Sequence, residues 1–301
     1  INSAGNYKYS KGHIAIFAIE LDGDELKSYK RITKEEVKKN TEKQIMYCEI
    51  RTQEPSSWYN GQTYLDTMSE EAVSEFIKVT HKAYKEKSGK YFGSIIPGIF
   101  TDEPNYGGFS VNGNTVNIPW TDKISQIFKK RYGYDLLNFI PEVILRYKND
   151  DFSKARHDYI ETINNLFVNA FGKMIYDFCE KNKLLYTGHV LSEESLRSQT
   201  NVVGSTMRFY EYMQAPGIDI LCAQGLKREG GAEPEYLTAK QCVSVLNQMG
   251  RKWMLSELYG CTGWHFTLAE HKAVGDWQAA MGVNLRCQHL SWYTMKGEAK
   301  R

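Results

Sequence analysis

The chain has 301 residues, with 38 lysines and arginines against 36 aspartates and glutamates, for a formal charge of +2. This near-neutral balance excludes a strongly basic nucleic-acid-binding protein and an acidic tail protein. Hydrophobic residues make up 42% and charged residues 25% of the chain, which excludes global disorder. No apolar stretch reaches the roughly 18 residues of a membrane span, so we expect neither nucleic acid nor a membrane as a partner.

The cysteines indicate neither a zinc site nor a disulfide scaffold, because they form no C-x-x-C pair and no compact Cys/His cluster. Cys179, Cys222, Cys242 and Cys287 lie in apolar runs, where a thiol behaves as a small hydrophobic group. Free core thiols are typical of a reducing compartment and favour the cytoplasm.

Residues 1–60 predict a small β-rich segment, separate from a second domain over residues 61–301. Two strand-like runs, 13–21 and 25–32, flank an Asp-Gly-Asp turn, and residues 44–51 give a third. We expect a small antiparallel meander.

From residue 63 onward, short apolar runs alternate with helical patterns. The predicted strands begin near residues 64, 95, 184, 218, 252 and 283. The predicted helices include one opened by Ser69, a long one over 153–182, one over 236–249 and one begun by a capping box at Thr267 and Glu270.

This alternation predicts an α/β fold with a parallel sheet, either open and doubly wound or closed as a (β/α)8 barrel. A closed barrel needs two further strands before residue 64 and a last helix beyond Arg301, so we expect a barrel that is incomplete at its start. The sequence does not favour a nucleotide-binding fold, because no glycine-rich phosphate-binding motif follows a predicted strand.

Ionisable or amide side chains follow every predicted strand, where a structural turn needs only Gly, Asn or Ser. In a barrel, the chemistry lies at the carboxyl ends of the strands. The residues found there are Asp66, Asp102 with Glu103, His189 with Glu193 and Glu194, Gln224, Glu257 with Tyr259, and His289 with Trp292.

Glu103 is the first candidate catalytic residue. It follows the apolar run 94–100 and precedes Pro104, which fixes the exit of the chain. Neighbouring strand residues point to opposite faces, and we favour Glu103 over Asp102 because of its longer side chain. In the alternative interpretation, Asp102 caps the next segment and Glu103 pairs with a surface lysine.

Glu257 is the second candidate. It follows an apolar strand and lies near Tyr259 and Trp264 in sequence, where desolvation would raise the pKa of an unpaired carboxyl. The alternative is a salt bridge to Arg286. Glycoside hydrolysis needs two carboxyl groups, one as acid and one as nucleophile or base, and these two glutamates fit that requirement.

The other strand-end residues suit a sugar site. His189 and His289 could bond a sugar hydroxyl, orient a glutamate or bind metal, and a structural hydrogen bond fits equally well. Trp264 and Trp292 are candidate sugar platforms, although core packing explains each of them as readily.

Several segments resemble a known family. They are GIFTDEPNY at 98–106, LLYTGHVLSEESL at 184–196, APGIDIL at 215–221, SELYGCTGW at 256–264 and HLSWYTMKGEAKR at 289–301. They resemble bacterial glycoside hydrolase catalytic domains that are linked to the family 106 α-L-rhamnosidases and are often described as related to family 2 enzymes with sugar-binding domains. The resemblance extends from Tyr64 to Arg301.

The resemblance implies a (β/α)8 barrel, a glycoside substrate and accessory sugar-binding domains in the full-length protein. Asp102-Glu103-Pro104 is similar to the Asn-Glu-Pro of clan A glycosidases, whose Glu after the fourth strand is the acid/base. By the same likeness, Glu257 takes the place of the nucleophile. Asp102 departs from the Asn that usually binds the sugar 2-hydroxyl. Family 106 enzymes invert and are associated with calcium, so Ca²⁺ is the one cofactor implied, and retention and inversion both stay open.

We therefore expect a glycosidase in which Glu103 is the general acid and Glu257 the nucleophile or base. The residues expected to line the substrate site are Asp66, Asp102, His189, Gln224, Tyr259, Trp264, His289 and Trp292. The spacing of the residues themselves predicts no metal site. Two alternatives stay open: a metal-dependent barrel enzyme acting on sugars, and a barrel that binds glycans without chemistry.

Overall fold

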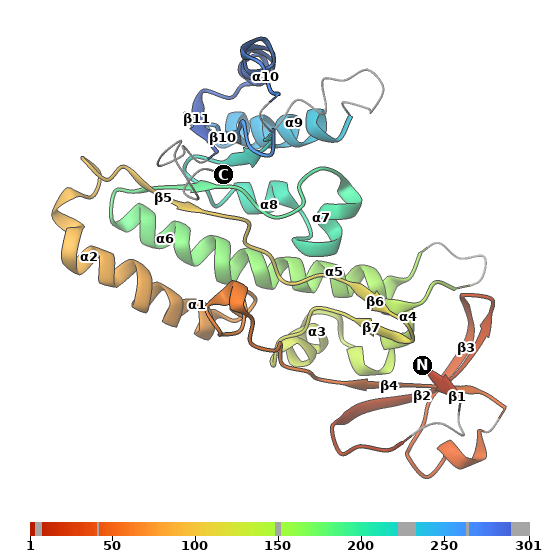
Figure 1. Ribbon diagram of the computed structural model, residues 1–301. Coiled ribbons are helices and arrows are strands. Elements are labelled where there is room, and N and C mark those ends of the chain that lie inside the picture. Colours follow the sequence, from red (N-terminus) through yellow and green to blue (C-terminus); the bar gives the residue numbers. More distant parts are fainter. Residues whose placement is uncertain (4–7, 41, 148–151, 222–232, 263–264, 290–301) are drawn as a thin grey trace. The chain divides into compact units, whose positions relative to one another are not determined.

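The computed structural model describes residues 1–301 apart from 4–7, 41, 148–151, 222–232, 263–264 and 290–301 (Figure 1). The described residues form a mixed α/β protein that divides into two compact units. The first unit comprises residues 1–66 and 107–166, and the second comprises residues 67–106 and 167–301. The N-terminal segment thus shares its unit with residues 107–166, and the predicted division after residue 60 stays a prediction.

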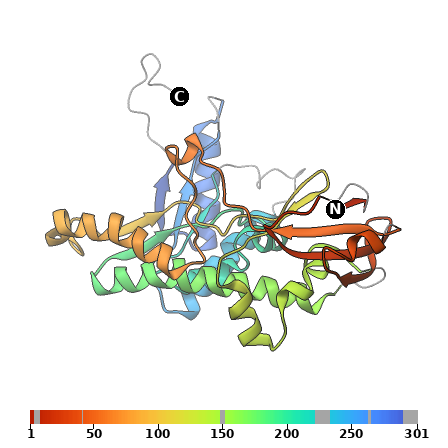
Figure 2. The same cartoon turned by 90° about the horizontal axis from the view of Figure 1, so that it is seen from below.

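An antiparallel sheet forms the start of the first unit, and Figure 2 shows its red and orange strands side by side. The strands are β1 (Asn2–Ser3), β2 (His13–Asp22), β3 (Glu25–Arg31) and β4 (Gln44–Glu49). These bounds confirm the three predicted strands. The predicted meander is wrong, because the order β1-β4-β2-β3 makes β2 an inner strand beside both β3 and β4.

Both faces of the inner strand β2 are covered. Ile16 packs with Val37 in the apolar cluster on one face. On the other face Phe17 and Ile19 are fully buried, and β2 contacts the short helix η6 (Leu136–Asn138). A strand buried on both faces reads as a nearly continuous apolar run, as β2 does.

Parallel strands form the centre of the second unit. They are β5 (Gly98–Thr101), β8 (Leu185–Gly188), β9 (Gly217–Asp219), β10 (Leu255–Leu258) and β11 (Leu285–Gln288). Strands β5 and β8 pair with each other, and β10 pairs with β9 on one side and β11 on the other. The N–H of Ala215, just before β9, donates to the carbonyl of Tyr186 in β8 at 3.1 Å. The strands therefore follow one another in chain order.

Two details of the strand prediction are wrong. Residues 64–66 form no strand, since three residues carry too little pattern to distinguish a strand from a loop. The run that starts near residue 95 becomes a strand only at Gly98, after Pro97, whose carbonyl accepts the N–H of Leu185 at 2.9 Å. Among the described residues the parallel strands do not close into a barrel.

Both units also contain helices. They are α1 (Glu70–Phe76), α2 (Ala83–Ser88), α3 (Ile124–Tyr132), α4 (Ile140–Ile144), α5 (Lys154–Phe167), α6 (Met174–Lys181), α7 (Leu196–Val202), α8 (Thr206–Tyr210), α9 (Glu233–Gln248) and α10 (Leu268–Met281). Ser69 caps α1 and a capping box of Thr267 and Glu270 opens α10, as predicted. Within the described residues, no helix combines the length and apolarity needed to cross a bilayer.

The long helical period predicted over 153–182 is confirmed as α5 and α6, which are joined by a π-helical turn at Val168–Lys173. A hairpin of β6 (Ser110–Asn112) and β7 (Thr115–Asn117) completes the first unit. In the second unit, helices α1 and α6 lie side by side (Figure 1).

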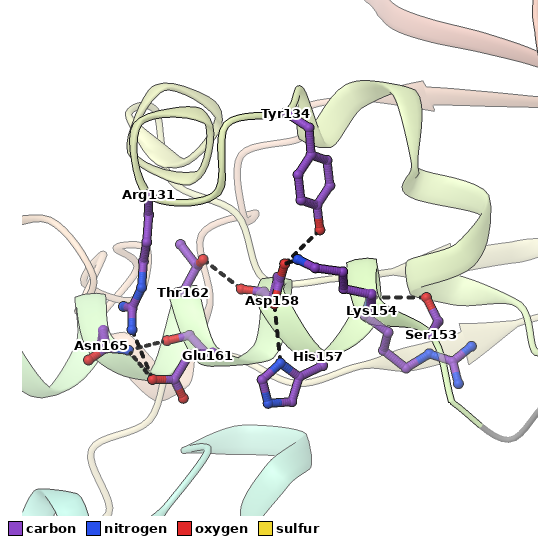
Figure 3. A network of polar contacts seen from close by, with 10 residues as sticks. Arg131, Tyr134, Ser153, Lys154, His157, Asp158, Glu161, Thr162 and Asn165 are labelled. Carbon is purple, nitrogen blue, oxygen red and sulfur yellow. Dashed lines mark hydrogen bonds and ion pairs between the residues drawn. The ribbon is translucent and has the colours of Figure 1, made fainter.

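A polar network surrounds Asp158 on α5 (Figure 3). The Asp158 side chain is only 6% exposed. It accepts hydrogen bonds from the Tyr134 hydroxyl at 2.8 Å and from the Lys154 ammonium, and it lies 3.2 Å from Nδ1 of His157. Burial alone would raise the pKa of Asp158, but these hydrogen bonds outweigh it and hold the pKa below its usual value.

Replacing Asp158 with Asn should lower the free energy of unfolding by about 1–3 kcal/mol, because a buried charged hydrogen bond is lost. Urea denaturation measures this loss. Asp177→Asn is the matched control: Asp177 also pairs with a lysine four residues earlier, Lys173, but its side chain is 54% exposed. The control should change stability by less than about 0.5 kcal/mol, and equal losses in both variants would contradict this account.

His81 is a buried histidine in an apolar setting. It is 4% exposed, and its ring meets the edges of Phe76 and Phe178 with centroids 5.3 Å away. Neither ring nitrogen has a hydrogen-bond partner among the described residues. Burial lowers the pKa of His81, since a charged imidazolium would lose its hydration there.

A lowered folded-state pKa means that the unfolded chain binds the proton more readily, so stability is lost as the pH falls below about 6.5. His81→Leu should therefore reduce the drop in melting temperature between about pH 7.5 and about pH 5.5. The exposed His265 supplies the control, because His265→Leu should leave the drop unchanged. An unchanged pH dependence in His81→Leu would show that His81 does not limit stability in acid.

Candidate active site

Charged side chains of the second unit gather at the carboxyl ends of the parallel strands. Asp102 and Glu103 follow β5, and His189 follows β8 directly. Asp219 is the last residue of β9, Glu257 lies in β10, and His289 follows β11. Of these residues, the strand-end pattern predicted Asp102, Glu103, His189, Glu257 and His289.

Glu257 and His189 form the centre of this cluster. Oε2 of Glu257 lies 2.8 Å from Nε2 of His189, and Oδ1 of Asp102 lies 3.6 Å from the same nitrogen. His189 is 1% exposed, Glu257 16% and Asp102 75%. The buried imidazole therefore lies beneath two carboxylates of increasing solvent exposure.

His289 approaches Glu257 from the neighbouring strand. Its Nε2 lies 3.8 Å from Oε1 of Glu257, and its backbone N–H donates to the carbonyl of Leu258 at 2.7 Å. The Glu257 carboxylate consequently lies between two imidazoles, of which only His189 is within hydrogen-bonding distance.

The alternative salt bridge between Glu257 and Arg286 is absent. In the parallel register Glu257 lies opposite Cys287, while Arg286 lies opposite Ser256. Successive side chains of a strand alternate between faces, so Arg286 projects to the other face. There its guanidinium donates to the carbonyl of Gly275 at 3.1 Å.

Asp219 is a site residue that the sequence interpretation did not select. It lies in register with Glu257 on β10. Burial raises the pKa of Asp219 to about 6. The nearby carboxylates of Glu257, Glu103 and Asp102 add to this rise, and His189 opposes it. Its position at the end of an apolar strand is the signal that could have found it. The predicted strand begins near residue 218 and is followed by Gln224, which made Asp219 an interior position.

Glu103 is exposed and adopts a left-handed backbone conformation with φ of 45°. Because regular strand geometry ends at Thr101, the strict alternation of faces does not extend to Glu103. Desolvation raises the pKa of the Glu103 carboxyl, and the carboxylates of Asp102 and Glu257 add to this effect while His189 opposes it. Glu103 therefore lies within the electrostatic reach of the cluster.

The remaining predicted residues lie elsewhere or outside the described part of the chain. The Tyr259 ring packs against His271 on α10, with the two ring centroids 4.8 Å apart. Asp66 belongs to the first unit, where it accepts a hydrogen bond from Thr121 at 2.6 Å. Gln224, Trp264 and Trp292 lie outside the described residues.

The cluster also has the composition of a cation site. One ligand atom each from Asp102, His189 and Glu257 lies within 4.8 Å of the others. Two carboxylates and one imidazole suit a divalent ion that accepts mixed oxygen and nitrogen ligands. Calcium prefers an all-oxygen shell, so this set fits it only through Asp102 and Glu257.

Comparison with known proteins now identifies the class. The family model of the glycoside hydrolase family 106 α-L-rhamnosidases matches residues 50–295, and the chain belongs to this family. Among solved structures, a rhamnosidase from Novosphingobium sp. PP1Y is similar in fold, with a TM-score of 0.59 and 20% sequence identity. The match covers 83% of this chain and 23% of that one. No curated protein matches the chain.

Because the backbones of β5 and β8 are closely packed at Gly188, we expect that any side chain at this position would disturb the adjacent site residue His189. It has φ of 117°, and a methyl group there would overlap the carbonyl of Thr101 in the paired strand. Gly188→Ala should displace the adjacent His189 and lower the melting temperature. Gly250→Ala is the matched control, because Gly250 also has positive φ (63°) but no atom within 4 Å of the added carbon. If the melting temperature falls equally in both variants, the contact with Thr101 is not the cause of the loss in Gly188→Ala.

Proposed function

We propose that this chain carries the catalytic centre of an α-L-rhamnosidase, which hydrolyses the bond between an α-L-rhamnosyl residue and the rest of a glycoside. The observation that carries the proposal is the Glu257 carboxylate, held 2.8 Å from His189 beside the acidic pair at residues 102 and 103. Two carboxyl groups of different protonation are what glycosidic bond cleavage requires.

Glu103 acts as the general acid in this proposal. Its raised pKa keeps a larger fraction of the carboxyl protonated near neutral pH, and its exposure lets a leaving-group oxygen approach. The proton of Glu103 passes to the glycosidic oxygen as the bond to the anomeric carbon breaks.

Glu257 acts from the other side as nucleophile or as the base that activates water. Nε2 of His189 lies at hydrogen-bonding distance from Oε2 of Glu257, 2.8 Å away, and this contact fixes the orientation of the carboxyl group that either role needs. His189 is too deeply buried to contact a sugar, so we assign it to orienting Glu257. Asp102, Asp219 and His289 are left to bind the substrate and to set the charge of the site.

The chain-order succession of the strands β5, β8, β9, β10 and β11 supports a (β/α)8 barrel in the complete enzyme. We infer that residues 61–301 contribute to this barrel and that accessory sugar-binding domains accompany it. A divalent cation held by Asp102, His189 and Glu257 would replace the hydrogen bond between His189 and Glu257, so such a cation belongs to the second candidate below.

The cation cluster also supports a second candidate, a metal-dependent barrel enzyme acting on sugars. Dialysis against a chelator discriminates the two. If hydrolysis persists without metal and is lost in Glu103→Gln, the two-glutamate mechanism stands. If activity disappears on chelation and returns with one divalent ion while Glu103→Gln stays active, the metal-dependent candidate replaces it.

Substrates that differ in leaving group test the two roles. Glu103→Gln should lower kcat/KM by about 10²–10⁴-fold on an alkyl α-L-rhamnoside, which needs protonation. On a dinitrophenyl α-L-rhamnoside, whose leaving group departs without a proton, the loss should be far smaller. Glu257→Gln should abolish hydrolysis of both substrates.

The control is Glu75→Gln on α1, an exposed glutamate paired with Lys78, which should behave as wild type. Equal losses on both substrates in Glu103→Gln would remove Glu103 from the role of acid.

A further inference from the structure

A third glutamate near the site is buried and takes no part in the mechanism above. Glu193 follows β8 and is 4% exposed. Its Oε1 accepts the backbone N–H of Val190 at 3.0 Å, which closes the turn after His189. The carboxyl thus binds the backbone of the residue next to the imidazole that contacts Glu257.

The backbone of Glu193 is held as firmly as its side chain. Its carbonyl accepts Nε2 of Gln199 on α7 at 2.7 Å and the hydroxyl of Thr238 on α9 at 2.9 Å. Gln199 is 1% exposed and Thr238 is 2% exposed. Gln199 in turn donates to Oε1 of Gln241 at 2.8 Å. Two helices therefore fix the position from which the Glu193 side chain reaches back to Val190.

The turn after His189 contains a strained residue, which the surrounding contacts must hold in place. The backbone is left-handed at Ser192, with φ of 55°, a conformation that costs energy outside glycine and persists only where the surroundings hold it. Among the residues that the structure describes, Glu257 is the one carboxylate at hydrogen-bonding distance from His189, 2.8 Å away. A small shift of the turn would move its Nε2 away from that carboxylate.

We propose that Glu193 is a positioning residue, whose buried carboxyl fixes the turn after β8 so that His189 stays aligned with Glu257. The proposal rests on the proposed hydrolase function and deepens it.

The raised pKa of the Glu193 carboxyl is consistent with a structural role as a hydrogen-bond acceptor. Burial raises the pKa of Glu193 well above its usual value; the Val190 N–H opposes the rise and the Asp219 carboxylate adds to it. A neutral carboxyl still accepts the Val190 N–H through its carbonyl oxygen. Glutamine has the same shape and the same acceptor, so Glu193→Gln should preserve the turn, whereas Glu193→Ala removes the acceptor.

Steady-state kinetics of the intact protein on an aryl α-L-rhamnoside test the proposal. Glu193→Ala should lower kcat by about 10–100-fold, the scale expected for misplacing a catalytic group by an ångström or less. KM should stay within about twofold, because the sugar contacts remain. Glu193→Gln should restore most of kcat. In Glu193→Ala, hydrogen exchange of the Val190 amide should also accelerate.

Asn284→Ala is the control for a general loss of stability. Asn284 joins the amino-terminal ends of β10 and β11, which lie opposite the site. It accepts the N–H of Met254 and donates to the carbonyl of Lys252, each at 2.9 Å. It should lower the melting temperature without lowering kcat. If Glu193→Ala does not fold, Thr238→Val, which removes one bond to the Glu193 carbonyl, should produce a smaller loss of kcat.

The proposal is overturned if Glu193→Ala, or Thr238→Val in its place, keeps wild-type kcat. It is also overturned if Glu193→Gln is as impaired as Glu193→Ala. Failure of the proposed function is recognised separately, as wild-type protein that hydrolyses no rhamnoside. In that case the Val190 exchange rate and the His189 imidazole resonance still test the positioning, since both must change in Glu193→Ala and stay unchanged in Asn284→Ala.

Discussion

The contact between the Glu257 carboxylate and the His189 imidazole is the interaction on which the site depends. The Glu257 side chain is 16% exposed, so it has lost most of its contact with water, and a buried polar group is costly unless protein groups replace that water as hydrogen-bonding partners. His189 supplies such a partner from the end of the strand β8, and His289 lies on the other side. Both imidazoles are in place because parallel strands end at one edge of the sheet, so side chains distant in sequence converge there.

Convergence has an electrostatic cost. Asp102, Glu103, Asp219 and Glu257 are all acidic, and mutual repulsion together with burial raises the pKa of Asp219 and Glu103. His189 opposes the rise at both residues, so one buried ring moderates the charge of the whole cluster. At Glu103 the raised pKa favours the protonated form that a general acid needs.

Much of the second unit was predictable from sequence, because apolar runs ending in polar residues are a local pattern. Strands β8, β9, β10 and β11 and the caps of α1 and α10 follow from it. The inner position of β2 was not predictable, since the pattern within one strand does not mark which other strands pair with its edges. Asp219 was missed because periodicity does not mark where a strand stops within an apolar run. The approach of His189 to Glu257 needs the register between strands, which no single segment encodes.

The most direct test is the separation of the Glu103 and Glu257 carboxyl groups in a crystal structure of the intact protein with a bound rhamnoside analogue. The account predicts that the two groups face each other across the anomeric carbon. A separation of about 5–5.5 Å would indicate a retaining enzyme, and about 6.5–9.5 Å an inverting one with room for water. A much larger separation, or either side chain turned away from the sugar, would contradict the pairing of these two residues as acid and base.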